Sequence, residues 1–362
     1  MSKIIILTNN SSGLFDFRKE LIQAIISKNN SVKAYTPFDL KVDELRDMGV
    51  DLCETKLERR GMNPLKDFKL FFQYLKIIKN ERPDLVITYT IKPNVYGGVA
   101  CSIFNVPYAV NITGLGSAFE NGRILKNIAA LMNKIACKKA KVVFFENEEN
   151  RQFFVREHIV KEKQTYRLNG AGVNLERYHV TPYPKGETIK FLFMGRIMKE
   201  KGIDELFTAM RRLVQNGVKC ELDVLGGYEE NYKDIIDKYE SEGWLHYYGY
   251  QEDVRPYIER CHCFVLPSWH EGMANTNLEC AASARPVITS NISGCKEAVI
   301  DKKSGFLVEK QKIEDLFDKM KKFTNLTYAE REQMGLVGRA HMEDIFDKKK
   351  VVKETMGCLW EN

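Results

Sequence analysis

The sequence has no apolar run long enough to cross a lipid bilayer. A spanning helix needs roughly 18 consecutive apolar residues, and no stretch of the chain approaches that length. The first ten residues, MSKIIILTNN, hold one charge and an apolar run of only four residues. That pattern predicts a first β-strand and not a secretory signal. We therefore expect the chain to act in the cytoplasm.

Other absences exclude whole classes of site. The nine cysteines include no Cys-x-x-Cys pair, so neither a zinc ribbon nor a dithiol redox centre is predicted, and reduced thiols are expected. No complete Gly-x-Gly-x-x-Gly follows a predicted strand, which disfavours a nicotinamide dehydrogenase. No helix-turn-helix, zinc-finger or RNA-binding signature is present, so nucleic acid is not an expected partner. No cofactor is predicted.

The 362 residues do contain a regular alternation of short apolar runs and amphipathic segments. This alternation is typical of the α/β class with doubly wound parallel sheets, and the length favours two domains. The predicted strands, all short and rich in Val, Ile and Phe, are Ile4–Thr8, Val32–Thr36, Leu85–Thr90, Tyr108–Ile112, Val142–Glu146, Phe191–Gly195, Glu221–Leu225, Leu245–Tyr248, Phe264–Leu266, Pro286–Thr289 and Phe306–Val308.

Composition also predicts where the domains meet. Residues 181–188 hold two prolines and a glycine, which is typical of a linker. This segment separates a Rossmann-like N-terminal domain, residues 1–180, from a Rossmann-like C-terminal domain, residues 189–345. Residues 346–362 are expected to form a last helix.

Charge is unevenly distributed between the two halves. The first 180 residues hold 28 Lys and Arg against 19 Asp and Glu, and the remainder holds 27 against 30. A basic half predicts an anionic partner. A phosphorylated lipid carrier on an anionic membrane surface fits this charge better than nucleic acid does.

The segment from Cys263 to Gly305 concentrates groups suited to binding an activated sugar. It reads CFVLPSWHEGMANTNLECAASARPVITSNISGCKEAVIDKKSG, which predicts a buried strand, a short loop and a helix from about Asn275. Glu271 in the loop and Glu279 about one turn inside the helix flank the amide N–H groups of the helix start, where an anion is favoured. A nucleoside diphosphate sugar matches this order, with its diphosphate between two carboxylates that accept from hydroxyls.

These residues resemble a known family. Glu271 and Glu279, with seven residues between them, resemble the E-x7-E signature of the retaining glycosyltransferases of the GT4 type. GRIMKEKG, which begins at Gly195, resembles a second signature, and LGGYEE and HYYGYQEDV resemble the family's third strand and base-binding loop. The resemblance covers nearly all of the chain. It implies the GT-B fold, in which two Rossmann-like domains face a cleft and the last helix packs back on the N-terminal domain.

The resemblance also implies roles for individual residues. The predicted catalytic residues are Arg196 and Lys201, which would clamp the donor diphosphate, and Glu271, which would hold the hexose beside the reacting carbon. Whether Glu271 is a nucleophile or a positioning group stays open. Glu279 is expected to bind the ribose hydroxyls. The other expected donor contacts are Gly13, Gly272, Met273, Ala274, Asn275 and Tyr250.

Gly13 has a second explanation. It follows the first predicted strand and precedes a helix expected from about Asp16, so an ordinary strand-to-helix turn accounts for it equally well. The resemblance places this loop opposite the donor diphosphate, where a glycine lets the backbone approach closely.

Acceptor contacts are expected in the first half. TGLGS, which begins at Thr113, and the Arg59-Arg60 pair resemble the branch of the family that extends lipid-linked oligosaccharides in bacteria. Many relatives have a histidine near this position, whereas this chain has Asn111 and Thr113. Arg59 and Arg60 are explained equally well as a solvated surface pair. The expected acceptor-binding residues are Thr113, Gly114, Gly116, Ser117, Arg59 and Arg60.

Residues 65–79 form a strongly amphipathic pattern. The apolar face is expected to hold Phe68, Phe71, Phe72, Leu75 and Ile78, while lysines fall elsewhere on the helix. Two interpretations remain open: a helix packed on the sheet, or a basic aromatic helix at a membrane surface.

The predicted function is that of a retaining glycosyltransferase in cell-surface glycan synthesis. It would move a hexose or N-acetylhexosamine from a nucleotide sugar, expected to be UDP-linked, to a saccharide on an undecaprenyl-diphosphate-type lipid. The enzyme would work at the inner face of the membrane as a peripheral protein. Arg196, Lys201 and helix N-termini would stabilise the leaving diphosphate, and the chain has no Asp-x-Asp, so no metal is predicted.

Two alternatives remain beside this prediction. A nucleotide-sugar 2-epimerase has the same kind of two-domain fold but lacks this E-x7-E pattern. A non-catalytic subunit that binds a nucleotide sugar would share the donor residues, and donor hydrolysis by the isolated protein would argue against it.

Overall fold

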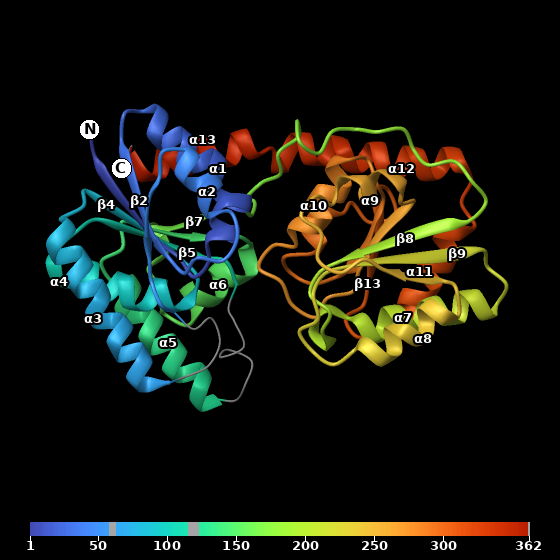
Figure 1. Ribbon diagram of the computed structural model, residues 1–362, viewed down its shortest axis with the longest axis horizontal. Coiled ribbons are helices and arrows are strands. Elements are labelled where there is room, and N and C mark those ends of the chain that lie inside the picture. The colour runs from blue at the N-terminus through green and yellow to red at the C-terminus, as the bar shows by residue number, and fades with distance from the viewer. Residues whose placement is uncertain (58–62, 115–122, 361–362) are drawn as a thin grey trace. The chain divides into compact units, whose positions relative to one another are not determined.

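The computed structural model describes residues 1–57, 63–114 and 123–360, and the chain divides into two compact units (Figure 1). Unit 1 consists of Met1–Ala171 and Lys349–Asn362, and unit 2 of Gly172–Lys348. The segment expected to be a linker, residues 181–188, therefore lies inside unit 2. It is held there because the buried guanidinium of Arg285 donates to the Thr181 hydroxyl at 2.7 Å and to the Pro182 carbonyl at 3.1 Å.

Unit 1 is built on a parallel sheet of seven strands in the order β3-β2-β1-β4-β5-β6-β7 within the described residues. The strands are β1 Lys3–Leu7, β2 Ser31–Thr36, β3 Asp51–Glu54, β4 Leu85–Tyr89, β5 Tyr108–Ile112, β6 Val142–Phe145 and β7 Thr165–Arg167. The sequence predicted all of these except β3 and β7. Both lie at the edges of the sheet and are short and largely exposed, so they lack the apolar run that marks a buried strand.

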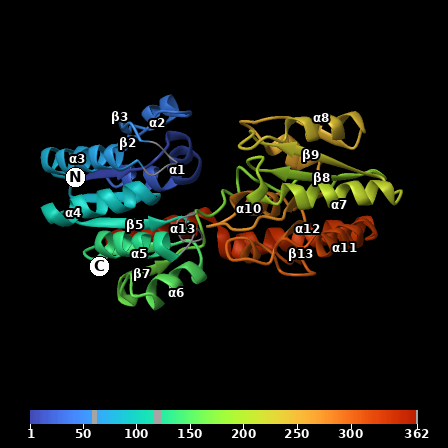
Figure 2. The same cartoon turned by 90° about the horizontal axis from the view of Figure 1, so that it is seen from below.

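Helices cover both faces of the unit 1 sheet. They are α1 Ser11–Ser27, α2 Val42–Asp47, α3 Pro64–Glu81, α4 Gly98–Phe104, α5 Arg123–Cys137, α6 Glu148–Arg156 and α13 Lys348–Trp360, with a π-helical turn at Pro93–Gly97. Successive residues of β1 face opposite layers. Ile4 and Ile6 pack with α1, α2 and α13, whereas Ile5 and Leu7 pack with α3, α4 and α6. Figure 2 shows α3, α4 and α5 side by side on the second of these faces.

The apolar face predicted for residues 65–79 is split in the structure. Leu70, Tyr74, Ile77 and Ile78 of α3 are buried against the sheet, whereas Phe68 and Phe72 are 63% and 51% exposed. The sequence carries more apolar side chains than one helix face can bury, so the predicted grouping of Phe68 and Phe72 with Ile78 was wrong.

Unit 2 is built on a parallel sheet of six strands in the order β10-β9-β8-β11-β12-β13. The elements are β8 Ile189–Met194, α7 Ile203–Gln215, β9 Cys220–Leu225, α8 Lys233–Ser241, β10 Leu245–Tyr247, α9 Arg255–Arg260, β11 Cys263–Leu266, α10 Asn275–Ala282, β12 Val287–Ser290, β13 Gly305–Val308, α11 Ile313–Thr324 and α12 Tyr328–His341. Every strand predicted for this half is present. Figure 1 shows α7, α8 and α11 on one face of the sheet and α9, α10 and α12 on the other.

Each sheet has a point where the strand order reverses. In unit 1 this point lies between β1 and β4, and in unit 2 between β8 and β11. Ligands of open α/β sheets bind outside the carboxyl ends of the strands at such points. The predicted class, α/β with two doubly wound parallel sheets, is thus confirmed. In unit 2 the loops after β8 and β11 lie where a ligand is expected to bind. Within the described residues, no helix is both long and apolar enough to pass through a membrane.

Candidate active site

The loops that follow β8 and β11 touch at the point of reversal in unit 2. Gly202, in the first loop, has a φ of +72°, and a Cβ built there would lie 2.1 Å from the carbonyl oxygen of Pro267 in the second. Any other residue at this position would force the two loops apart. The sequence thereby brings the Gly195–Gly202 motif against the segment that contains Glu271.

Lys201 and Glu271 form an ion pair across these two loops. Their side chains are only 18% and 13% exposed. Lys201 is held by a short 3₁₀ turn, Lys199–Lys201, and Glu271 lies four residues beyond Pro267. Two of the three predicted catalytic residues are therefore in direct contact, with a cation beside the carboxylate.

The loop that contains Glu271 is anchored through its neighbours. The backbone N–H of Trp269 donates to the Glu200 carbonyl at 2.9 Å, and the indole N–H of Trp269 donates to Oε1 of Glu205 at 3.0 Å. His270 Nε2 lies 3.2 Å from Oε2 of Glu200. Glu205 is 8% exposed, so its carboxylate depends on this bond. The loop after β11 is thus fixed through Glu200 to the loop after β8 and through Glu205 to α7.

Two residues expected to contact the donor have buried side chains at the start of α10. Met273 and Ala274 are 6% and 4% exposed and belong to the hydrophobic core of unit 2. The Ala274 N–H donates to the carbonyl oxygen of Gly294 at 2.7 Å, so this amide is engaged and is not directed at a ligand. Asn275, the first residue of α10, keeps a buried Oδ1 without a partner in the described part of the chain.

Gly294 holds the loop of Glu271 from the other side. Its φ is +85°, and a Cβ there would lie 2.6 Å from the carbonyl oxygens of both Glu271 and Gly272. Glycine is therefore required for the loop after β12 to pack against the carboxylate-bearing loop.

Glu279 lies in the second turn of α10 and contacts Tyr178. Burial, and then the nearby charge of Glu279, raise the pKa of the Tyr178 hydroxyl. Because this phenol stays protonated, it is a donor beside the carboxylate. Glu279 is thereby oriented by a residue outside the E-x7-E segment.

Arg196 and Tyr250 lie apart from the Lys201–Glu271 pair. Arg196 follows β8 and is half-exposed, and its NH1 lies 3.5 Å from Oε2 of Glu229. Tyr250 follows β10, two strands away from β8 in the sheet, and is 60% exposed. Both residues lie at the same carboxyl edge of the sheet, but neither forms a hydrogen bond or an ion pair with Lys201 or Glu271.

In unit 1, Gly13 lies in the first turn of α1 and not in a loop. The helix begins at Ser11, earlier than the predicted start near Asp16. It begins there because the backbone N–H groups of Ser11 and Ser12 donate to Oδ1 of Asp39 at 3.0 and 2.8 Å, which satisfies orphan donors of the first turn. The sequence separates these partners too widely for the cap to be foreseen.

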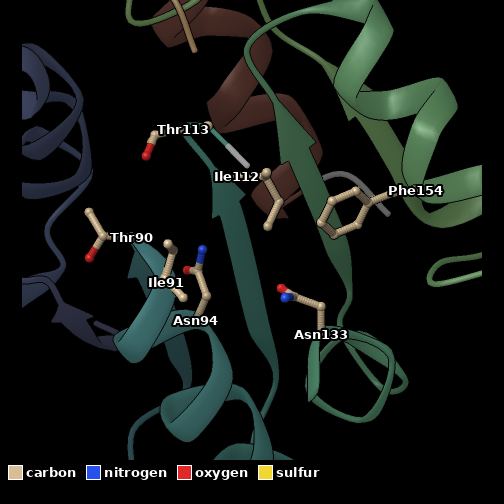
Figure 3. Close-up of a pocket in the computed structure, with 8 residues that line it drawn as sticks. Thr90, Ile91, Asn94, Ile112, Thr113, Asn133 and Phe154 are labelled. Atoms are coloured by element: carbon tan, nitrogen blue, oxygen red, sulfur yellow. The ribbon is translucent and has the colours of Figure 1, made fainter. Parts of the chain in front are cut away.

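Thr113 and Gly114 line a small pocket at the carboxyl ends of β4 and β5 (Figure 3). Thr90, Asn133 and Phe154 also face it, from the end of β4, from α5 and from α6. The four other predicted acceptor residues, Arg59, Arg60, Gly116 and Ser117, lie outside the described residues.

The sequence interpretation missed several residues of these sites. Trp269, Glu205 and Tyr178 act through partners distant in the chain, which no local motif reveals. Thr90 is the last residue of a predicted strand, and that position at the carboxyl end was a signal that it could line a site. In the part of the chain that the structure describes, no three His, Cys, Asp or Glu side chains form a group that could hold a metal ion.

Two family models match the chain. Residues 3–147 match the model described as glycosyl transferase 4-like, and residues 177–341 match the model described as glycosyl transferases group 1. Together these ranges span most of both units and contain every predicted site residue.

Curated relatives match over most of their length. An N,N'-diacetylbacillosaminyl-diphospho-undecaprenol alpha-1,3-N-acetylgalactosaminyltransferase of Campylobacter jejuni is 26% identical over 336 residues, which cover 88% of this chain and 88% of the relative. A UDP-Gal:alpha-D-GlcNAc-diphosphoundecaprenol alpha-1,3-galactosyltransferase of Escherichia coli is 25% identical and covers 74% of this chain and 73% of the relative.

Solved structures share the architecture. HepE of Anabaena, in complex with UDP and glucose, has a TM-score of 0.81 at 14% identity and covers 100% of both chains. Sucrose-phosphate synthase of Thermosynechococcus elongatus has a TM-score of 0.81 at 18% identity and covers 100% of this chain and 98% of that one. At these identities the likeness concerns the fold, and it confirms the predicted GT-B type.

Proposed function

The chain belongs to the group 1 glycosyl transferases, and from that premise we propose that it transfers a sugar from a UDP-linked donor to a saccharide on undecaprenyl diphosphate. The two relatives named above support this acceptor, because each name specifies an N-acetylated sugar on diphosphoundecaprenol. The transferred sugar would be N-acetylgalactosamine or a related hexose. The predicted class of enzyme, a glycosyltransferase, is confirmed by the family matches, which do not favour an epimerase.

The observation that carries the proposal is the Lys201–Glu271 pair at the strand reversal of unit 2. Cleavage of a UDP-sugar leaves a diphosphate whose negative charge grows as the bond to the sugar breaks. A fixed ammonium group beside that position stabilises the transition state more than the ground state. Glu271, already oriented by Lys201, would accept hydrogen bonds from the sugar hydroxyls near the reacting carbon.

The remaining donor contacts are proposed for residues at the same carboxyl edge of the unit 2 sheet. Glu279, oriented by Tyr178, would accept from the ribose hydroxyls. The half-exposed Arg196 would exchange Glu229 for the diphosphate, because a phosphate group offers a guanidinium two acceptors. Transfer would proceed with retention of configuration and without a metal, with the charge of the leaving group balanced by Arg196 and Lys201.

For the acceptor we propose unit 1 together with the membrane that carries it. Exposed apolar side chains lie on α3 and α5 of this unit, and exposed lysines accompany them on the same helices. This combination suits an anionic bilayer surface, where apolar groups enter the interface and lysines meet the headgroups. The apolar residues concerned are Leu65, Phe68 and Phe72 on α3 and Ile128, Leu131 and Ile135 on α5. Work at the inner face of the membrane is consistent with a lipid-linked acceptor.

The test is a panel of donors with a synthetic polyprenyl-diphosphate N-acetylhexosamine as acceptor. UDP-GalNAc, UDP-Gal, UDP-GlcNAc, UDP-Glc and GDP-Man are compared by release of free nucleotide and by mass of the lipid product. We expect one UDP-sugar to give a disaccharide product with an α-linkage, with turnover unchanged in EDTA. The absence of any lipid-linked product from every donor would overturn the proposal, and loss of turnover in EDTA would overturn metal independence alone.

A further inference from the structure

Among the residues that the structure describes, only neutral ones line the pocket at the carboxyl ends of β4 and β5. Figure 3 shows Thr90 and Thr113 on one side and Phe154 on the other, with Ile112 and Asn133 between them. No Lys, Arg, Asp or Glu of the described ranges is among its lining residues. This described lining offers a phosphate or carboxylate no counter-charge, so it suits an uncharged polar group with an apolar part.

Hydrogen-bonding capacity in this pocket is only partly used by the protein. The side-chain amide of Asn133 donates to the Ala129 carbonyl at 2.8 Å, and the residue is 6% exposed, while no described group donates to its Oδ1. Thr90 Oγ1 is buried and has no partner among the described residues. Buried polar atoms are rarely left unpaired, so these two oxygens are available to a ligand.

The amide of the neighbouring Asn94 is, by contrast, bonded within the protein at both its oxygen and its nitrogen. It accepts from the Thr88 hydroxyl at 2.7 Å and donates to the Asn111 carbonyl at 2.8 Å. Asn94 therefore supports the pocket wall, and the groups left for a ligand are those of Asn133, Thr90 and Thr113.

Thr90 is also held in an unfavourable backbone conformation. Its φ is +72°, in the left-handed region that a β-branched residue rarely adopts. The N–H of Asn94 donates to the Thr90 carbonyl at 2.9 Å and fixes the turn. Strain of this kind persists where the surrounding structure maintains it, and it is concentrated at ligand sites.

We propose that this pocket binds the acetamido group of the acceptor sugar, a role that rests on the function proposed above. An acetamido group has one N–H, one carbonyl oxygen and a methyl group. Oδ1 of Asn133 would accept from the N–H, a threonine hydroxyl would donate to the carbonyl, and Ile112 with Phe154 would contact the methyl. The pocket thereby selects acceptors whose sugar is N-acetylated over those with a hydroxyl in its place.

The experiment compares three synthetic polyprenyl-diphosphate acceptors that differ at one carbon: N-acetylglucosamine, glucosamine and glucose. The preferred donor is used, and kcat/KM is measured for each acceptor. We expect N-acetylglucosamine to exceed glucose by at least tenfold. In Thr113→Val and Asn133→Leu this ratio should fall several-fold towards one, whereas Thr113→Ser, which keeps the hydroxyl, should retain it.

The outcomes separate the two proposals. Product from no acceptor overturns the proposed function. Product from all three acceptors at equal kcat/KM, or variants that lose activity equally with every acceptor, leaves the transferase intact and overturns the acetamido pocket. If Asn133→Leu does not fold, Thr113→Val and the acceptor series on the unaltered protein decide the question.

Discussion

Lys201 and Glu271 lie 70 residues apart in the sequence and form an ion pair between the loops that follow β8 and β11. Glycines at 202 and 294 allow three loops to meet at this pair, since a side chain at either position would collide with a backbone carbonyl. The pair is formed in the free protein, so a diphosphate bound as proposed would meet an oriented cation without a change in loop structure. Catalysis by preorganised charge depends on such an arrangement.

The first prediction concerns the cation of this pair. We expect Lys201→Ala to lower kcat by about 100-fold to 1,000-fold, because an ammonium group that faces the leaving diphosphate is lost. Steady-state kinetics with the preferred donor measures this effect. Lys199→Ala is the matched control, since Lys199 lies on the same short turn and its side chain sits over the Trp269 ring. Comparable losses in both variants would contradict the role of Lys201.

The second prediction concerns the anchor of the Glu271 loop. Trp269→Phe removes the indole N–H that donates to the buried Glu205, and we expect it to lower the free energy of unfolding by about 1–3 kcal/mol and kcat by about tenfold. Trp244→Phe is the control, because its indole N–H donates to Glu242, far from the site in the sequence, at 2.9 Å. Denaturant titration and kinetics should show a loss of kcat in the first variant only.

The third prediction concerns the orientation of Glu279. Tyr178→Phe deletes the hydroxyl that contacts this carboxylate, and we expect the Kd for the donor nucleotide to rise about threefold to tenfold, which corresponds to one hydrogen bond. Calorimetry with UDP measures it. Tyr183→Phe loses an equally buried hydroxyl, which donates to the His262 carbonyl at 2.8 Å, and should leave UDP affinity unchanged. Equal UDP affinity in all three proteins would refute the role of Tyr178.

The fourth prediction concerns pH. His262 is 3% exposed, and its Nδ1 accepts the Lys190 backbone N–H at 3.1 Å. Burial, and then the charges of Arg331, Arg285 and Lys190, lower its pKa to about 4. The unfolded chain, with a histidine pKa of about 6.5, takes up the proton first as the pH falls. The contribution of neutral His262 to the free energy of unfolding is therefore fully present above about pH 6.5. It declines by up to about 3 kcal/mol as the pH falls from there to about pH 4.

A comparison of histidine variants isolates this contribution. In His262→Gln the free energy of unfolding should fall less steeply between about pH 6.5 and pH 4 than in the unaltered protein. His246→Gln, at a side chain that is 42% exposed, should keep the original slope. Identical slopes in all three proteins would show that His262 is not the group that titrates.

The fifth prediction concerns the apolar side chains of α3 and α5. We expect Phe68→Glu with Leu131→Glu to reduce co-sedimentation with vesicles of anionic lipid by about tenfold or more, because two apolar contacts are replaced by charges that the surface repels. Leu336→Glu on α12 of unit 2 is the control, since this leucine is 43% exposed and belongs to neither helix. Equal binding by both altered proteins would exclude α3 and α5 from the membrane contact.

The sequence predicted the strands of unit 2, because apolar runs mark buried strands. The family resemblance assigned Lys201 and Glu271 to one donor site, but their ion pair was not predicted. The sequence did not predict that Met273 and Ala274 are core residues. A helix start looks alike in sequence whether its amides face a ligand or, as for Ala274, the carbonyl of Gly294. Local pattern carries no information about a partner that comes from the next strand.

The same limit of local sequence patterns explains why the pocket at the ends of β4 and β5 was only partly predicted. Thr113 was identified from the resemblance of TGLGS to a family motif, but the pocket is also lined by Asn133 from α5 and Phe154 from α6. These residues come together only when β4, β5 and β6 align. The split face of α3 has a related cause, since periodicity shows which residues share a side of a helix and not how much of that side the sheet covers.

The route of the chain has a consequence for its synthesis. Unit 2 is one uninterrupted segment, Gly172–Lys348, whereas the core of unit 1 also takes Val351, Met356 and Leu359 from α13. During synthesis on the ribosome, unit 2 can fold as soon as its last strand and helices have emerged. The first unit to be translated is the last to be completed, and a polypeptide that stops before α13 leaves the helical layer of α1 and α2 on its sheet incomplete.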